Sequence, residues 1–109
     1  MKVKDIIIVK EVNVMGIPHT NDMDYFFKGV LSLKNIDDCY KFFEDICTIK
    51  EMQDLAQRMD VARLLAEGKV YSEIAKITGA SSATISRVNK CLMYGTGGYK
   101  EILGRLKGE

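Results

Sequence analysis

The sequence predicts an all-α protein organised around a helix-turn-helix at residues 71–93. Three observations predict this. The stretch YSEIAKITGASSATISRVNKCL reads as two short helices joined at Gly79. Apolar residues recur at helical spacings from Asn21 onward. The tetrapeptide from Thr48 to Glu51 has the form of a capping box that opens a long helix.

The turn of the helix-turn-helix is marked by small residues. Ala75 lies in the middle of the first helix, where a short side chain lets a second helix cross closely. Gly79 stands where a chain leaving a helix usually adopts a positive φ, which is cheap only for glycine. Ser81 is then placed to cap the second helix. The spacing therefore predicts two helices that meet at residues 79–81.

The second helix has one apolar side and one side of short or basic residues. Ile85, Val88 and Leu92 recur at i, i+3 and i+7, which gives one apolar stripe to pack on the first helix, where Ile74 lies near the middle. Short side chains let a helix approach the major groove, and Arg or Lys then reaches phosphates or guanine edges. The same spacing also fits an ordinary αα-corner with a solvated polar face. The candidate DNA-contacting residues are Ser72, Ser81, Ser82, Ala83, Thr84, Ser86, Arg87 and Lys90.

Two shorter helices are expected before the capping box. Asn21 or Asp22 can cap the first, and Asn35 can cap the second. Their apolar positions include neighbouring aromatics on one side, which is more apolar surface than a single short partner could cover. These positions are Met23, Phe26, Phe27, Val30, Leu31, Ile36, Cys39, Phe42, Phe43, Ile46 and Cys47.

The capping box begins the longest predicted helix, which ends at Gly68, and a last helix follows the GTGG segment at residues 95–98. The long helix has an apolar row at helical spacing. Its members are Met52, Leu55, Ala56, Met59, Ala62, Leu65 and Ala66.

Residues 1–20 are read as an N-terminal arm and residues 21–109 as the helical domain. The arm is rich in Ile and Val and predicts a β-strand over about residues 3–15, ended by Gly16 and Pro18. This strand could pair with its copy in a dimer or lie on the helical core. The segment could also be a vector-derived or mispredicted extension.

Charge and composition limit the function. The net charge is +1, which argues against a general polyanion binder. Residues 81–107 nevertheless hold five bases and one acid, so the C-terminal third is basic. Three cysteines without a CxxC pair are interpreted as reduced core residues of a cytoplasmic protein. No metal site, cofactor, membrane span or catalytic constellation is expected, so we do not expect an enzyme.

Residues 42–99 resemble the Trp repressor superfamily, and more specifically its Trp repressor-like branch of the YerC/YecD type. The blocks LAQRMDVARLL and TGASSATISRV carry this resemblance, which extends over about residues 21–107. It implies a six-helix fold and an intertwined homodimer in which the N-terminal helices of each chain wrap the other. It also implies that residues 81–93 enter the major groove of double-stranded DNA, with base contacts made largely through water.

The resemblance also implies a possible effector pocket at Thr48, Arg58 and Arg87, which match the positions that grip the corepressor in the tryptophan-binding repressor. Each residue also has another explanation: Thr48 as a helix cap, Arg58 as a surface base and Arg87 as a backbone contact. The glycine that follows the second arginine in that repressor is Val88 here. A branched side chain would occupy the space of an indole ring, so we expect any small-molecule effector to differ from tryptophan.

The favoured function is a dimeric, sequence-specific DNA-binding transcriptional regulator, a repressor in the bacterial cytoplasm that associates with the nucleoid when bound. The alternative is a protein-interaction module of the transcription machinery that keeps the helix-turn-helix as a scaffold. The near-zero net charge favours this alternative mildly.

Overall fold

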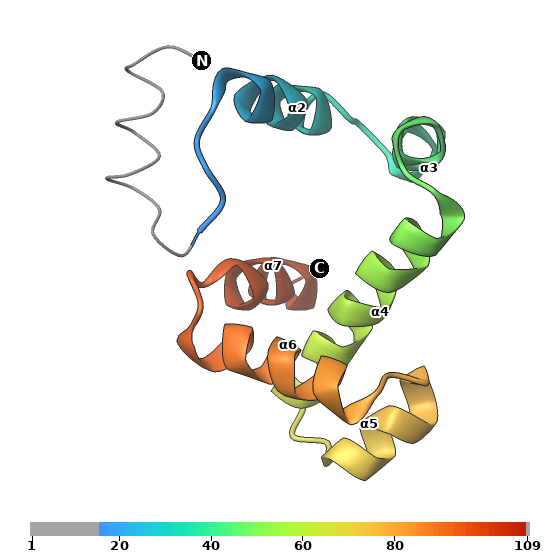
Figure 1. Cartoon of the computed structure of the whole chain (residues 1–109), viewed down its shortest axis with the longest axis vertical. Helices are drawn as coiled ribbons and strands as arrows, with labels where there is room; N and C mark the ends of the chain where they lie inside the picture. Colours follow the sequence, from blue (N-terminus) through green and yellow to red (C-terminus); the bar gives the residue numbers. More distant parts are fainter. Residues whose placement is uncertain (1–15, 109) are drawn as a thin grey trace. The chain divides into compact units, whose positions relative to one another are not determined.

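The computed structural model describes residues 16–108, and over that range the chain is all-α (Figure 1). Six helices follow one another and no strand is present among these residues, so the predicted fold class is confirmed. The predicted strand at residues 3–15 lies outside the described residues. The helices are α2 (Asn21–Leu31), α3 (Ile36–Ile46), α4 (Ile49–Ala66), α5 (Tyr71–Thr78), α6 (Ser82–Tyr94) and α7 (Gly98–Lys107).

The chain forms two compact units, one ending at Phe43 and one beginning at Glu44. In the first unit, α2 is capped by Thr20, whose hydroxyl oxygen accepts a hydrogen bond from the Met23 N–H. The predicted cap at Asn21 or Asp22 was therefore wrong. Thr20 still has an extended backbone, whereas Asp22 already lies in the first helical turn. There the Thr20 hydroxyl donates to its carboxylate and lowers the pKa of Asp22.

The start of α3 agrees with the sequence. The Asn35 side chain accepts from the Asp38 N–H at 2.8 Å, and the Asp38 carboxylate accepts from the Lys34 N–H at 3.1 Å. Two free N–H groups are thus satisfied at one helix end.

Aromatic rings join α2 to α3. Phe26 and Phe42 are stacked with their centroids 6.0 Å apart, and Phe27 and Phe43 lie beside them. Even so, neither helix contains a buried residue, and Leu31 is 84% exposed. The apolar excess expected from the sequence therefore remains uncovered in the single chain.

In the second unit, α4 begins with the predicted capping box. The Thr48 N–H donates to the Glu51 carboxylate at 2.8 Å, and the Glu51 N–H donates to the Thr48 hydroxyl at 3.1 Å. The helix ends at Ala66, and Gly68, two residues later, has a φ of 87°. There the N–H groups of Gly68 and Lys69 donate to the carbonyls of Leu65 and Leu64, a Schellman ending.

The core of the second unit lies between α4 and the helix-turn-helix. α4 packs against α5, α6 and α7 (Figure 1). Of the predicted apolar row on α4, only Ala62 is fully buried, and Leu65 packs against the core while partly buried. Because helices surround α4 on more than one side, Val61 and Leu64 turn into the core instead. The buried residues are Val61, Ala62, Leu64, Ile74, Ala80, Ile85, Val88 and Leu92.

The cysteines differ from expectation in one respect. All three are free thiols, as predicted, but Cys39 and Cys91 are exposed and Cys47 is only partly buried. They flank apolar stripes rather than filling a core. Within residues 16–108, no helix combines the length and apolar character needed to cross a membrane.

Candidate nucleic-acid interface

The turn between α5 and α6 has the predicted backbone. Gly79 has a φ of 74° and its N–H donates to the Ala75 carbonyl at 2.8 Å. A side chain at Gly79 would meet no atom within 4 Å, so the backbone conformation, not space, requires glycine here. Ala80 follows and is 4% exposed. The turn is therefore anchored in the core by the residue directly after its glycine.

Ser81 caps α6 as predicted. Its hydroxyl oxygen accepts from the Thr84 N–H at 3.1 Å, and the Ser81 and Thr84 hydroxyls are also hydrogen-bonded to each other at 3.1 Å. Both were predicted to contact DNA. In the free chain their hydroxyls instead define the start of the helix.

The inner side of α6 carries its three predicted apolar residues. Ile85 is fully buried, Val88 is 2% exposed and Leu92 is 8% exposed. Ile85 and Val88 belong to one buried cluster with Ile74 of α5 and with Val61 and Leu64 of α4. This packing fixes which side of α6 faces outward.

The outer side of α6 brings together most of the candidate DNA-contacting residues. Ser82, Ala83, Ser86, Arg87 and Lys90 are all exposed. Ser82 and Ser86 are four residues apart, as are Ala83 and Arg87, so they form two adjacent rows along the helix. These five residues are named here the α6 outer stripe.

Ser72, the remaining candidate, is exposed as the second residue of α5. It therefore lies on the first helix of the pair, outside the α6 outer stripe.

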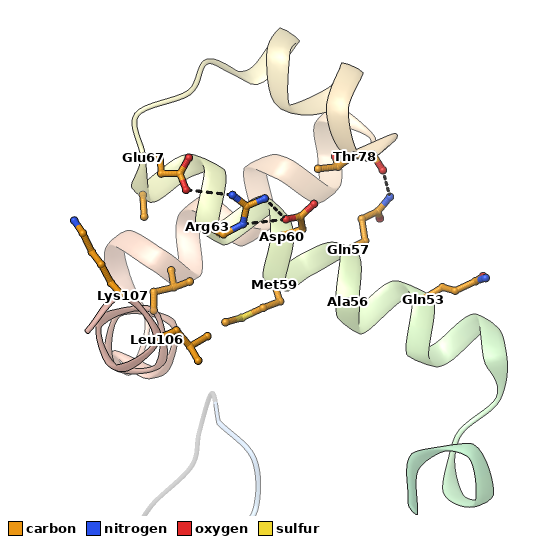
Figure 2. A pocket seen from close by; sticks show the side chains of 12 residues that line it. Gln53, Ala56, Gln57, Met59, Asp60, Arg63, Glu67, Thr78, Leu106 and Lys107 are labelled. Atoms are coloured by element: carbon orange, nitrogen blue, oxygen red, sulfur yellow. Dashed lines mark hydrogen bonds and ion pairs between the residues drawn. The ribbon is translucent and has the colours of Figure 1, made fainter. Parts of the chain in front are cut away.

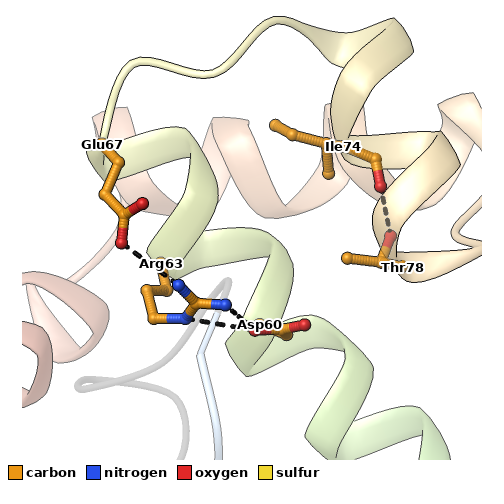
Figure 3. A network of polar contacts seen from close by, with 5 residues as sticks. All are labelled: Asp60, Arg63, Glu67, Ile74 and Thr78. Carbon is orange, nitrogen blue, oxygen red and sulfur yellow. Dashed lines mark hydrogen bonds and ion pairs between the residues drawn. The ribbon is translucent and has the colours of Figure 1, made fainter.

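The two bases of the α6 outer stripe are free of ion pairs with any of residues 16–108. Helix α6 contains no acidic residue. By contrast, Arg63 on α4 binds Asp60 at 2.5 Å and Glu67 at 3.2 Å (Figure 3). These carboxylates raise the pKa of Arg63, Asp60 having the larger effect. Arg87 and Lys90 thus keep their charge available for an external anion.

The three effector-pocket candidates do not converge in one chain. Thr48 precedes α4 and is occupied by the capping box, whereas Arg58 lies ten residues later, about 15 Å along the helix. The charges of Arg58 and Arg87 do act on one common side chain, Tyr99. Burial raises the pKa of Tyr99, the Cys91 thiol adds to this, and the two guanidinium charges act in the opposite direction.

A groove elsewhere in the second unit was not anticipated from the sequence. It has a volume of about 1010 Å³ and lies between α4, the end of α5 and α7 (Figure 2). Its walls include Met59 and Ala66 from the apolar row predicted for α4, together with Leu103 and Leu106. None of the candidate DNA or effector residues lines it. The apolar row on α4 was the available signal, but its spacing does not show that part of it lines a groove.

One polar link was also missed. The side-chain amide of Gln57 on α4 donates to the Thr78 carbonyl at the end of α5, at 3.1 Å (Figure 2). A glutamine on a helix surface resembles any solvated residue, so the sequence held no signal for it.

Comparison with known proteins agrees with this architecture. The family model described as Trp repressor protein matches residues 21–107. The uncharacterised protein YerC of Bacillus subtilis (strain 168) is 54% identical over 86 residues, which is 79% of this chain and 83% of YerC.

Two solved structures are similar as well. A TrpR-like protein from Eubacterium eligens ATCC 27750 superposes with a TM-score of 0.79 at 50% identity, over 81% of this chain and 91% of that one. A candidate Trp repressor from Staphylococcus aureus superposes with a TM-score of 0.81 at 38% identity, over 93% and 95% of the two chains. The chain therefore belongs to the Trp repressor protein family, whose fold is that of a DNA-binding regulator and not of an enzyme.

Proposed function

We propose that this protein is a homodimeric, sequence-specific DNA-binding repressor of transcription that reads the major groove with α6. The single observation that carries the proposal is the α6 outer stripe. It combines short side chains with two bases that have no ion pair within residues 16–108, on a helix without acids. Such a surface can approach base edges closely and still bind phosphates.

Within the stripe we assign different roles to different residues. Arg87 and Lys90 bind phosphates or guanine edges, and Ser82, Ala83 and Ser86 face the bases directly or through water. Ser81 and Thr84 support the helix start, and Ser72 at the start of α5 binds the DNA backbone.

The homodimer is supported by the uncovered apolar surface of α2 and α3. Neither helix contains a buried residue, and a second copy would cover this surface. Two α6 helices related by a two-fold axis read half-sites about one turn of DNA apart, roughly 34–36 Å. A repressor that binds DNA in this way acts in the cytoplasm, at the nucleoid.

We further propose that the repressor does not use tryptophan. Val88 is buried against the core, and the Thr48 hydroxyl already accepts from the Glu51 N–H. Titration calorimetry with L-tryptophan should therefore show no binding. Heat of binding that disappears in an Arg58→Ala variant would contradict this and restore the effector pocket.

The main test is selection of binding sites from random oligonucleotides by the purified protein. We expect an enriched palindromic sequence with half-sites about one helical turn apart. Arg87→Ala and Lys90→Ala should each weaken binding and reduce the slope of log affinity against log salt by about two, about one for each α6 of the dimer. Lys50→Ala removes the same charge outside the helix-turn-helix, where Lys50 forms an exposed pair with Asp54, and should change neither quantity.

The competing function, a protein-interaction module of the transcription machinery, is separated by the same experiment. A folded dimer that enriches no sequence, and whose affinity for DNA is unchanged by Arg87→Ala, would contradict the repressor and favour the module. Its near-zero net charge is the property that supports this alternative.

A further inference from the structure

Gln57 makes an unusual hydrogen bond for this chain. Its side-chain amide joins α4 to residue 78, 21 positions later. Every other side-chain hydrogen bond between residues 16–108 joins positions at most four apart. The helix-turn-helix is otherwise held to α4 by apolar packing, which has little directional preference.

The acceptor of this bond is a carbonyl that the helix itself leaves free. Thr78 is the last residue of α5, and the last four carbonyls of a helix have no partner within it. The Gln57 amide supplies that partner. Gln57 is only partly buried, so it reaches the carbonyl from the edge of the groove described above (Figure 2).

Thr78 then transmits this link to the turn. Its hydroxyl donates to the Ile74 carbonyl at 2.7 Å and accepts from the Ala80 N–H at 3.1 Å (Figure 3 shows the first bond). Ile74 and Ala80 are both buried, and Gly79 between Thr78 and Ala80 has a positive φ. One residue therefore connects α4, the end of α5 and the entry to α6.

We propose that Gln57 is a positioning residue for DNA recognition: by holding the Thr78 carbonyl, it fixes the turn from which α6 projects. This rests on the proposed DNA-binding function. Gln57 does not contact DNA in this proposal. It acts by reducing the range of orientations that α6 samples before binding, and a preorganised helix loses less freedom on the operator.

Three variants test the proposal. Gln57→Leu keeps a side chain of similar size without the donor, and Gln57→Glu keeps the shape but places a carboxylate against a carbonyl oxygen. Gln53→Leu is the matched control, one helical turn earlier on α4 and on the same groove, with an exposed side chain that has no hydrogen bond in residues 16–108.

Two measurements are made on each full-length variant. Hydrogen exchange of the Ala80 amide, followed by NMR, reports on the turn because this N–H donates to Thr78. Affinity for the selected operator and for unrelated DNA reports on recognition.

The three variants are expected to differ in the size of their effects. Gln57→Leu should speed Ala80 exchange and weaken operator binding on the order of fivefold, with little change for unrelated DNA. Gln57→Glu should do both more strongly, and Gln53→Leu should do neither. If Gln57 mattered only for packing, Gln57→Leu would change Ala80 exchange and operator affinity less than expected here, because Leu fills a similar volume.

Two outcomes overturn the proposal. Unchanged Ala80 exchange in both Gln57 variants would show that the bond does not hold the turn. Faster exchange with unchanged operator affinity would show that the turn does not set recognition. If the wild-type protein selects no operator, the proposed function fails, and Ala80 exchange alone still decides whether Gln57 holds the turn.

Discussion

The two units of this chain treat their apolar side chains differently. In the second unit, Val61, Ile74 and Ile85 are fully buried between α4, α5 and α6. In α2 and α3 no residue is buried, and Leu31 and Ile36 are 84% and 73% exposed. The second unit, which contains the helix-turn-helix, has a core of its own, whereas the first unit leaves apolar surface uncovered. The surface proposed to read DNA is thus set on packed helices, and the apolar surplus lies where a second copy is proposed to bind.

The largest effect is expected from the packed core. Ile85→Ala removes a fully buried side chain, leaves a cavity beneath α6 and should cost about 4 kcal/mol in the free energy of unfolding. Urea unfolding followed by circular dichroism measures it. A loss below about 1 kcal/mol would mean that the second unit depends less on its own core than the burial indicates.

A smaller effect is expected from the uncovered unit. Replacing Leu31 and Ile36 together by Ser should weaken the proposed homodimer by about 2 kcal/mol, because two exposed aliphatic side chains would lose their cover from the second copy. Sedimentation equilibrium gives the monomer–dimer constant. Asp24→Ser, an exposed polar change on the same helix, is the control. An unchanged constant in the double variant would show that a second copy does not cover these residues.

Two glycines with different backbone conformations offer a third comparison. Gly79→Ala should lower the free energy of unfolding by about 1 kcal/mol, since the φ of 74° at this position disfavours any residue with a Cβ. Gly104→Ala, in the middle of α7 and in open space, should stabilise by about 0.5–1 kcal/mol. Thermal unfolding of both variants checks the signs. Equal effects would mean that the turn does not need its left-handed residue.

The smallest effect concerns the start of α4. The Thr48 N–H, and secondly its hydroxyl, lower the pKa of Glu51 because they stabilise the carboxylate. A carboxyl whose pKa falls on folding stabilises the protein fully above its ordinary pKa and loses that contribution as the pH falls through the lowered value. Glu51→Gln should therefore be slightly less stable than wild type at neutral pH and equal to it in acid. Urea unfolding at the two pH values gives the difference, and a constant gap would contradict the ionised cap.

The features that the sequence predicts well are local. Caps such as Ser81 and Thr48, the glycine turn at Gly79, and the buried triplet of α6 depend on residues within one or two turns of each other. The family resemblance and the all-α class are likewise confirmed. The cap at Thr20 was missed because Thr, Asn and Asp at neighbouring positions are all good caps, and only the backbone decides among them.

The features that escaped prediction depend on distant parts of the chain. Which side of α4 is buried follows from the placement of α5, α6 and α7 around it, so Val61 and Leu64 could not be separated from Leu55 by periodicity. The Gln57 amide and the neighbourhood of Tyr99 likewise arise only when helices meet. For the DNA-contacting residues, the sequence predicted the α6 outer stripe, and their contacts with DNA remain a prediction.

The small number of free bases on α6 has a consequence for how the proposed repressor finds its site. A dimer would offer only Arg87 and Lys90 from each α6, so it would neutralise few phosphates through these helices. Its residence on random DNA would be brief, and most copies would diffuse freely between encounters instead of sliding along the chromosome. Occupancy of the operator would then follow the total concentration of the protein closely, and promoters could respond within the time in which its synthesis changes.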